Sequence, residues 1–464
     1  MKIKIFLITF VLILIIFGFF AYFYLSRSTI SISSNPSSAN VYINGKFVGT
    51  TPYETKLFKG KYEIRIVKDG FEEYSATVDI KGNKKEIISP NLEKLEYLLL
   101  VRQNKFYKVR TDGKVVKQLG ESTDGNPIFI SFSPDGSKIL YEVSSPSYKN
   151  SIWIMDVDGS NRKNLTGNIQ VSGRDFPQFF PDGKKVLFIA SGSKKGYLAF
   201  WTIDINGGDI KKVIEVKSDH EEVRYAISPD GKKILFYGYD ILQNLGTTSL
   251  WVLDYSGQNL INLTSEMNGK VIFATFFPDG NNILLDFLSS SKPQLTGLWV
   301  LSPDGKNIKK ITKFRENNDS EILSPKFSKD GKRIFFISGN CLWSVNIDGT
   351  DEKIIKAAVF DFCFFTKEEK ILLLETQSSL WVINIDGTGE KKITGDLLGE
   401  SDSTFPTFYY IFGPPFSLSP DESHVLLTKA YTEEVYIASL YTGKITKLNG
   451  YSLSCWFPEK SSNN

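Results

Sequence analysis

The sequence predicts an all-β protein preceded by one membrane-spanning helix. Three observations lead to this fold class: an apolar run near the start, short alternating segments between glycine turns, and a phrase that recurs through the remaining chain. Of the 464 residues, 41% are apolar and 14% are aromatic, which is enough for a sizeable hydrophobic core. The chain is therefore expected to fold over most of its length, in about three domains.

Charge and cysteine content exclude several classes of protein. The 55 basic and 52 acidic residues are interspersed and give a net charge of +3, so no basic footprint for nucleic acid is present. Three cysteines cannot form a disulfide framework in so long a chain. Cys341, Cys363 and Cys455 lie in strand-like apolar segments and are expected to be buried thiols, with a Cys341–Cys363 disulfide as the alternative.

Residues 5–25 form an apolar run without a charge, long enough to cross a hydrocarbon core of about 30 Å. Lys2 and Lys4 precede this run, so the positive-inside rule predicts a cytoplasmic N-terminus and an extracytoplasmic bulk. A cleaved signal peptide is the alternative, but the run is long and ends in bulky aromatic residues. We therefore expect residues 1–28 to be a cytoplasmic tail and transmembrane anchor of a single-pass membrane protein.

Residues 29–95 predict a small β-sandwich. Alternating segments such as TISIS and YEIRIV are separated by glycine turns, including the hairpin dipeptide Asn44-Gly45. The segment resembles the PEGA family, a small extracytoplasmic β-sandwich of prokaryotic surface proteins. The residues that carry this resemblance are Pro36, Ala39, Val41, Tyr42, Gly45, Gly49, Thr51, Pro52, Gly60, Tyr62, Gly70 and Phe71. The name-giving stretch differs, because this chain reads Pro-Ser-Ser-Ala.

Residues 96–464 contain a repeated phrase, as in FSPDGSKILY, FFPDGKKVLF and ISPDGKKILF. Aligned at the proline position, which is proline in six of them, the eight copies are spaced by 47, 48, 49, 51, 37, 54 and 38 residues. A second phrase, as in SLWVLDYSG, follows most copies. Proline, aspartate and glycine favour a tight turn, so each unit reads as four short antiparallel strands.

Such units bury both faces when they stack in a ring, which predicts a β-propeller. The repeat resembles the TolB-like family with its PD40, or WD40-like, repeats. The last copy, at SCWFPEK, is a lone first strand, and the segment from residue 97 to 119 has only later strands. Pairing the two ends closes the ring with eight blades; seven blades is the alternative if one degenerate copy is not a blade.

The repeated tryptophans and the aspartate-rich turns are both expected to have structural roles rather than functional ones. Six tryptophans occupy one slot of the second phrase and are expected to pack between blades: Trp153, Trp201, Trp251, Trp299, Trp343 and Trp381. The Asp156-x-Asp158-Gly turn resembles the start of a calcium loop, but Gly167 stands where an EF-type loop needs glutamate. Capping of the turn is the preferred interpretation, and no metal or cofactor is expected.

The long, irregular loops all lie on one face of the predicted propeller, opposite the tight turns. The longest, from residue 395 to 415, contains a cluster of aromatic residues. Loops on a rigid scaffold often carry function, so we expect this cluster to contact a partner. The alternative is that these aromatic residues form a lid over the channel or pack against the seventh blade. The candidate partner-binding residues are Phe405, Phe408, Tyr409, Tyr410 and Phe412.

The sequence predicts a protein that is not an enzyme, because no nucleophile motif is present and His220 and His424 are the two histidines. The expected function is that of a membrane-anchored interaction scaffold of the prokaryotic cell envelope, which binds a protein or peptide through the long-loop face. A module that binds cell wall or carbohydrate is the first alternative. An enzyme acting on envelope polysaccharide or peptide, with paired carboxylates in the channel, is the second.

Overall fold

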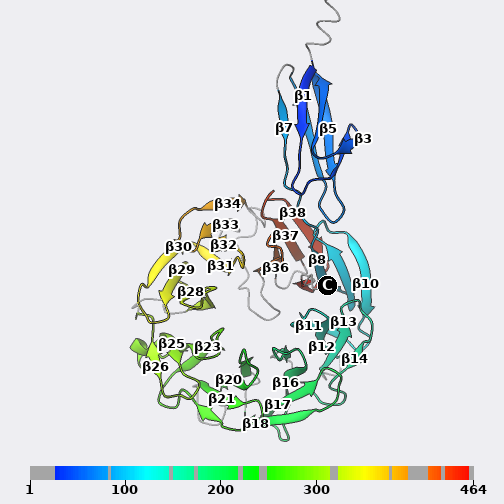
Figure 1. Cartoon of the computed structure of the whole chain (residues 1–464). Coiled ribbons are helices and arrows are strands. Elements are labelled where there is room, and N and C mark those ends of the chain that lie inside the picture. Colours follow the sequence, from blue (N-terminus) through cyan, green and yellow to red (C-terminus); the bar gives the residue numbers. More distant parts are fainter. Residues whose placement is uncertain are drawn as a thin grey trace, which may run out of the picture. The chain divides into compact units, whose positions relative to one another are not determined.

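The computed structural model describes residues 27–81, 85–145, 150–171, 176–217, 223–239, 248–313, 322–375, 379–395, 416–429 and 434–458. The chain divides into two compact units, Met1–Leu95 and Glu96–Asn464 (Figure 1). Each unit is described by itself, because their relative position is not determined.

The first unit is built from two small sheets. One sheet has the order β4-β1-β7, formed by β1 (Arg27–Ile32), β4 (Tyr53–Phe58) and β7 (Glu86–Ile88). The other has the order β3-β2-β5-β6, formed by β2 (Asn40–Ile43), β3 (Lys46–Thr50), β5 (Gly60–Val67) and β6 (Tyr74–Ile80). Alternate residues of β1, among them Ile30 and Ile32, are fully buried, as the alternating pattern predicts. The predicted hairpin at Asn44-Gly45 is confirmed, with φ angles of 47° and 77°.

The described residues of the second unit form eight four-stranded sheets arranged in a ring (Figure 1). The first of them has the order β10-β9-β8-β39, from β8 (Tyr97–Arg102), β9 (Lys105–Arg110), β10 (Val115–Glu121) and β39 (Leu453–Trp456). Each of the others takes four consecutive strands. They are β11 (Asn126–Phe132), β12 (Lys138–Ser144), β13 (Ser151–Asp156), β14 (Lys163–Asn164); β15 (Gln178–Phe179), β16 (Lys185–Ser191), β17 (Tyr197–Asp204), β18 (Lys211–Lys217); β19 (Val223–Ile227), β20 (Lys233–Tyr239), β21 (Thr248–Asp254), β22 (Ile261–Asn262); β23 (Lys270–Phe276), β24 (Ile283–Leu288), β25 (Gly297–Leu301), β26 (Ile308–Lys310); β27 (Leu323–Phe327), β28 (Arg333–Ser338), β29 (Cys341–Asn346), β30 (Lys353–Ala357); β31 (Val359–Phe364), β32 (Lys370–Glu375), β33 (Leu380–Asn384), β34 (Lys391–Thr394); and β35 (Phe416–Leu418), β36 (His424–Lys429), β37 (Glu434–Ser439), β38 (Ile445–Asn449).

The ring closes as expected from the two ends of the repeat, because β39 pairs antiparallel with β8. Hydrophobic clusters fill the spaces between neighbouring sheets. In one of them Leu187 and Phe200 from β16 and β17 meet Ile234 and Phe236 from β20. The six repeat tryptophans pack against these clusters, which confirms their predicted role.

The tight turns owe their shape to the aspartate and glycine of the repeated phrase. In the first copy Asp135 accepts hydrogen bonds from the hydroxyl of Ser133 and the backbone N–H of Ser137, and Gly136 has a φ of 70°. This conformation favours glycine because a Cβ atom would strain the backbone. The turns therefore form one end of the ring, and the longer connections leave from the other end.

The predicted fold class and location need one correction. In the part of the chain that the structure describes, no helix has the length and hydrophobicity to cross a membrane. The helical segment described there, η1 (Pro293–Leu295), has three residues. A transmembrane helix and a single-pass membrane location are therefore not supported, and residues 5–25, which carried that prediction, lie outside the described residues.

Candidate functional site

The candidate site lies at the long-loop end of the ring, on the innermost strands. The first strands β11, β23 and β31 lie on the inner side of the ring (Figure 1), and each starts at the end where the second strand of its sheet finishes. Equivalent residues follow from the register, in which Phe129 pairs with Glu142 and Phe273 pairs with Asp286. We call this set the mouth residues: Phe129, Phe176, Arg224, Phe273, Leu323 and Asp361.

Two mouth residues form an aromatic pair between neighbouring sheets. The rings of Phe129 and Phe176 are stacked, with centroids 4.7 Å apart and an interplanar angle of 9°. The hydroxyl of Tyr225 donates to the backbone carbonyls of Phe176, at 2.6 Å, and Leu187, at 3.0 Å. Gln178 Nε2 in turn donates to the carbonyl of Tyr225. These bonds tie the backbone around Phe176 to the neighbouring sheet that contains Tyr225.

The rest of the mouth combines apolar surface with charge. Arg224 is exposed, and Leu323 and Ile272 have 44% and 39% of their surface exposed. Lys326 Nζ lies 3.3 Å from Asp361 Oδ1 and 4.5 Å from the centroid of the Phe362 ring. The mouth can therefore offer a stacking platform, exposed aliphatic surface and a guanidinium to a ligand.

A buried carboxyl lies opposite this aromatic pair. Glu142 on β12 is fully buried, and Asn150 Nδ2 donates to its Oε1 at 2.8 Å. Its Oε2 has no hydrogen-bond partner within the part of the chain that is described. Burial without a compensating charge raises the pKa of Glu142 to about 8, so the group carries its proton at neutral pH. Sequence reasoning missed Glu142, whose equivalents in other copies of the phrase include Ile189, Ile337 and the acidic Asp286.

The predicted partner-binding residues Phe405, Phe408, Tyr409, Tyr410 and Phe412 lie outside the described residues. The structure instead brings together Phe129 and Phe176, which the sequence analysis did not select. What the two residues share is their position: each lies three residues before the end of its strand, which is Phe132 for β11 and Phe179 for β15. That signal needs the strand register before it becomes visible.

The other candidates have structural contacts. Asp156 accepts hydrogen bonds from Asn161 Nδ2 and Lys138 Nζ, and Asp158 Oδ1 accepts from the hydroxyl of Ser160 at 2.6 Å. These contacts belong to the turn and to the neighbouring strand.

The cysteines Cys341, Cys363 and Cys455 are half-buried rather than fully buried as predicted, and they are free, so the alternative of a disulfide between the first two is not realised. Burial raises the pKa of the Cys363 thiol to about 12. The pKa of the Cys455 thiol is also raised by burial. Both groups are therefore expected to remain thiols at physiological pH.

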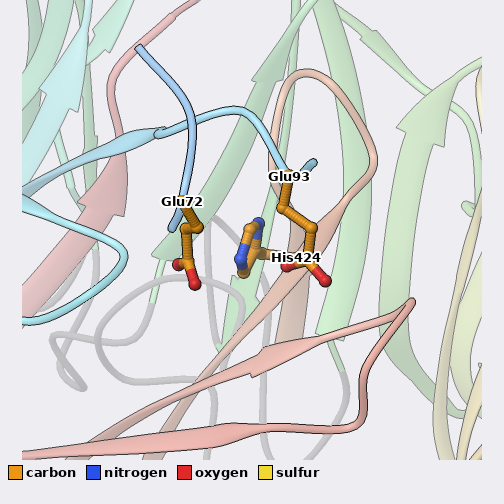
Figure 2. A group of neighbouring side chains, drawn as sticks. All are labelled: Glu72, Glu93 and His424. Atoms are coloured by element: carbon orange, nitrogen blue, oxygen red, sulfur yellow. The ribbon is translucent and has the colours of Figure 1, made fainter. Parts of the chain in front are cut away.

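Figure 2 draws Glu72, Glu93 and His424. In the first unit the backbone N–H of Glu72 donates to the carbonyl of Glu93 at 2.6 Å, which ties two loop segments together. In the second unit His424 begins β36, and its Nδ1 lies 2.7 Å from the hydroxyl of Ser423. Because these side chains belong to two units, each is assigned only the contacts within its own unit.

Comparison with known proteins identifies both folds. Residues 27–96 match the family model described as PEGA domain. A solved structure of dipeptidyl peptidase 4 from Porphyromonas gingivalis has a TM-score of 0.55 and 14% identity, over 76% of this chain and 58% of that one. TolB from Acinetobacter baumannii has a TM-score of 0.36 and 18% identity, over 63% and 75% of the two chains. The chain thus joins a PEGA domain to a β-propeller, which confirms the resemblance found in the sequence.

A curated relative corrects the expectation that the protein is not an enzyme. Dipeptidyl-peptidase 5 from Porphyromonas endodontalis is 26% identical over 140 residues, which are 27% of this chain and 19% of the relative. The name of this relative is that of a peptidase, which contradicts the prediction of a non-enzyme. The match spans about a fifth of that relative, so the activity of the relative as a whole is not transferred.

Proposed function

We propose that the propeller binds an extended segment of a peptide or protein at the mouth, as part of a peptide-handling scaffold of the cell envelope. The observation that carries the proposal is the stacked pair of Phe129 and Phe176, together with the exposed Arg224 at the equivalent position of the next sheet. Aromatic faces pack against apolar side chains, and a guanidinium donates hydrogen bonds to a backbone carbonyl or a carboxylate. Peptide is also the substrate that the names of both dipeptidyl peptidases give.

The envelope location rests on the PEGA domain, whose family resemblance is to extracytoplasmic proteins of prokaryotes. The aromatic cluster Phe405–Phe412 remains a second proposed contact for the same partner. Its replacement by F408S/Y409S/Y410S is expected to abolish binding while the near-UV circular dichroism spectrum stays unchanged. Unchanged binding would remove this segment from the proposal.

The test of the mouth uses the full chain and an array of immobilised 12-residue peptides. We expect the wild type to bind a subset of peptides that carry an apolar residue close to an acidic one. The variants R224E and F129S are expected to lose at least about tenfold in affinity for that subset. Y441S is the matched control, because Tyr441 is 64% exposed and lies in a tight turn at the other end of the ring. Equal binding by R224E, F129S and Y441S would refute the proposal.

A further inference from the structure

The tight-turn end of the ring carries a repeated ion pair. Four second strands begin with a basic residue that pairs with an aspartate of the turn after the third strand. The aspartate lies either directly opposite the basic residue or five residues further along the chain. The four pairs are Lys138–Asp156, Lys185–Asp209, Lys233–Asp254 and Arg333–Asp351.

The sheet β23–β26 has lost this ion pair at all three positions. Asn282 stands where the basic residue is found, Ser302 stands opposite it, and Asn307 stands five residues further along. The hydroxyl of Ser302 is used within its own turn, where it donates to Asp304 and accepts from the backbone N–H of Asn307. The side-chain amides of Asn282 and Asn307 have no hydrogen-bond partner among the described residues.

A pocket of about 270 Å³ opens at this place, between sheets β23–β26 and β27–β30. Its apolar walls are Phe277, Val300 and Ile347, which belong to or pack against the hydrophobic cluster between the two sheets. In the sheets that keep the ion pair, the aliphatic part of a lysine or arginine runs from the strand towards its aspartate. In the sheet β23–β26, Asn282 lines the pocket at the position where four other sheets have this basic side chain.

The rim of the pocket supplies polar groups of suitable chemistry. Asp348 Oδ1 accepts hydrogen bonds from the hydroxyl and the backbone N–H of Thr350, which lower the pKa of Asp348 and keep it ionised. Lys309 Nζ donates to the backbone carbonyl of Asp348 at 2.7 Å, so this ammonium already has an acceptor. The amide oxygens of Asn282 and Asn307 add two neutral acceptors.

We propose that this pocket binds the side chain of a lysine or arginine from a partner protein, in place of the basic residue that the chain itself supplies in four other sheets. The methylene groups lie against Phe277, Val300 and Ile347, and the charged end meets the amide oxygens and the Asp348 carboxylate. This site lies at the tight-turn end of the ring and is independent of the mouth.

The test is saturation-transfer NMR on the full chain with Nα-acetyl-lysine methylamide and Nα-acetyl-arginine methylamide. Nα-acetyl-norleucine methylamide is the matched probe, because it has a similar aliphatic chain without the charge. We expect saturation of the lysine or the arginine probe at least about fivefold above that of the norleucine probe. Equal saturation of all three probes would overturn the proposal.

Two variants locate the binding. N282K/S302D restores the ion pair of the repeat and is expected to abolish the saturation of the basic probes without lowering the melting temperature. N307D supplies the aspartate found at the equivalent positions in two other sheets and is expected to tighten binding at least about threefold. If the basic probes are still saturated in N282K/S302D, or if their saturation is unchanged in N307D, the probes bind elsewhere and the proposed pocket is refuted.

Discussion

The buried carboxyl of Glu142 makes the stability of the propeller depend on pH. In the unfolded chain this group ionises near pH 4.5, whereas in the folded protein its pKa is raised to about 8 by burial. Between these values the folded protein holds a proton that the unfolded chain has released. The free energy of unfolding therefore falls as the pH rises through this interval, by about 1.36 kcal/mol for each pH unit.

The variant E142Q removes this dependence and keeps an oxygen for the hydrogen bond from Asn150. Between pH 4.5 and pH 7 the wild type loses about 3 kcal/mol of stability, because Glu142 must take up a proton when the chain folds. We expect the two proteins to have similar stability at pH 4.5 and E142Q to be more stable by about 3 kcal/mol at pH 7. Urea unfolding of the full chain, followed by tryptophan fluorescence at several pH values, measures this difference.

The control is E215Q, for which the pH dependence has the opposite sign. Hydrogen bonds from Ser193 and Lys212 lower the pKa of Glu215 to about 2, so its contribution is present above pH 4.5 and is lost as the pH falls. A constant difference between wild type and E142Q from pH 4.5 to 7 would mean that Glu142 is ionised in the folded protein. The reasoning from burial would then be refuted.

Three further predictions concern the ring itself. The variant G159A is expected to lose more than about 2 kcal/mol of stability in urea unfolding, because Gly159 has a φ of 89° and an added Cβ would lie 1.9 Å from the carbonyl oxygen of Leu119; a loss below 0.5 kcal/mol would contradict this contact. Alkylation of Cys363 by iodoacetamide at pH 8 is expected to be at least about tenfold slower in the folded protein than in urea, because burial raises the pKa of its thiol to about 12. Mass spectrometry of the labelled peptide gives both rates. Equal rates would show that the Cys363 thiol is not buried in the folded protein. The variant L453D places a charge at a buried position of β39, so we expect proteolysis to cut β8–β10 before the other sheets; an unchanged digestion pattern would argue against closure of the ring by β39.

Much of the fold could be predicted from local patterns. The Asn44-Gly45 turn follows from the backbone freedom of its two residues, and the packing of the repeat tryptophans follows from their constant place in the phrase. The pairing of β39 with β8 could also be predicted, because a lone first strand at one end of the repeat needs the strands left over at the other. These features depend on a few neighbouring residues or on the count of repeats.

The candidate sites depend on information that the linear sequence does not display. The stack of Phe129 on Phe176 requires the strand register of two sheets, and the buried state of Glu142 requires the neighbouring sheet that covers it. The pocket beside Asn282 follows from a missing ion pair, which is noticed only when equivalent positions of several sheets are compared. The predicted membrane anchor was inferred from hydrophobicity alone, and no helix among the described residues supports it.

The antiparallel pairing of β8 with β39 has a mechanical consequence. The PEGA unit ends at Leu95 and β8 begins at Tyr97, so tension on that unit enters the propeller through β8. This strand is held by β9 on one side and by β39 on the other, with Leu453 opposite Val101 and Trp456 opposite Leu98. A force on the PEGA unit therefore acts directly on the β8–β39 pairing that closes the ring. Under such a force we expect β39 to separate from β8 before any sheet made of four consecutive strands unfolds.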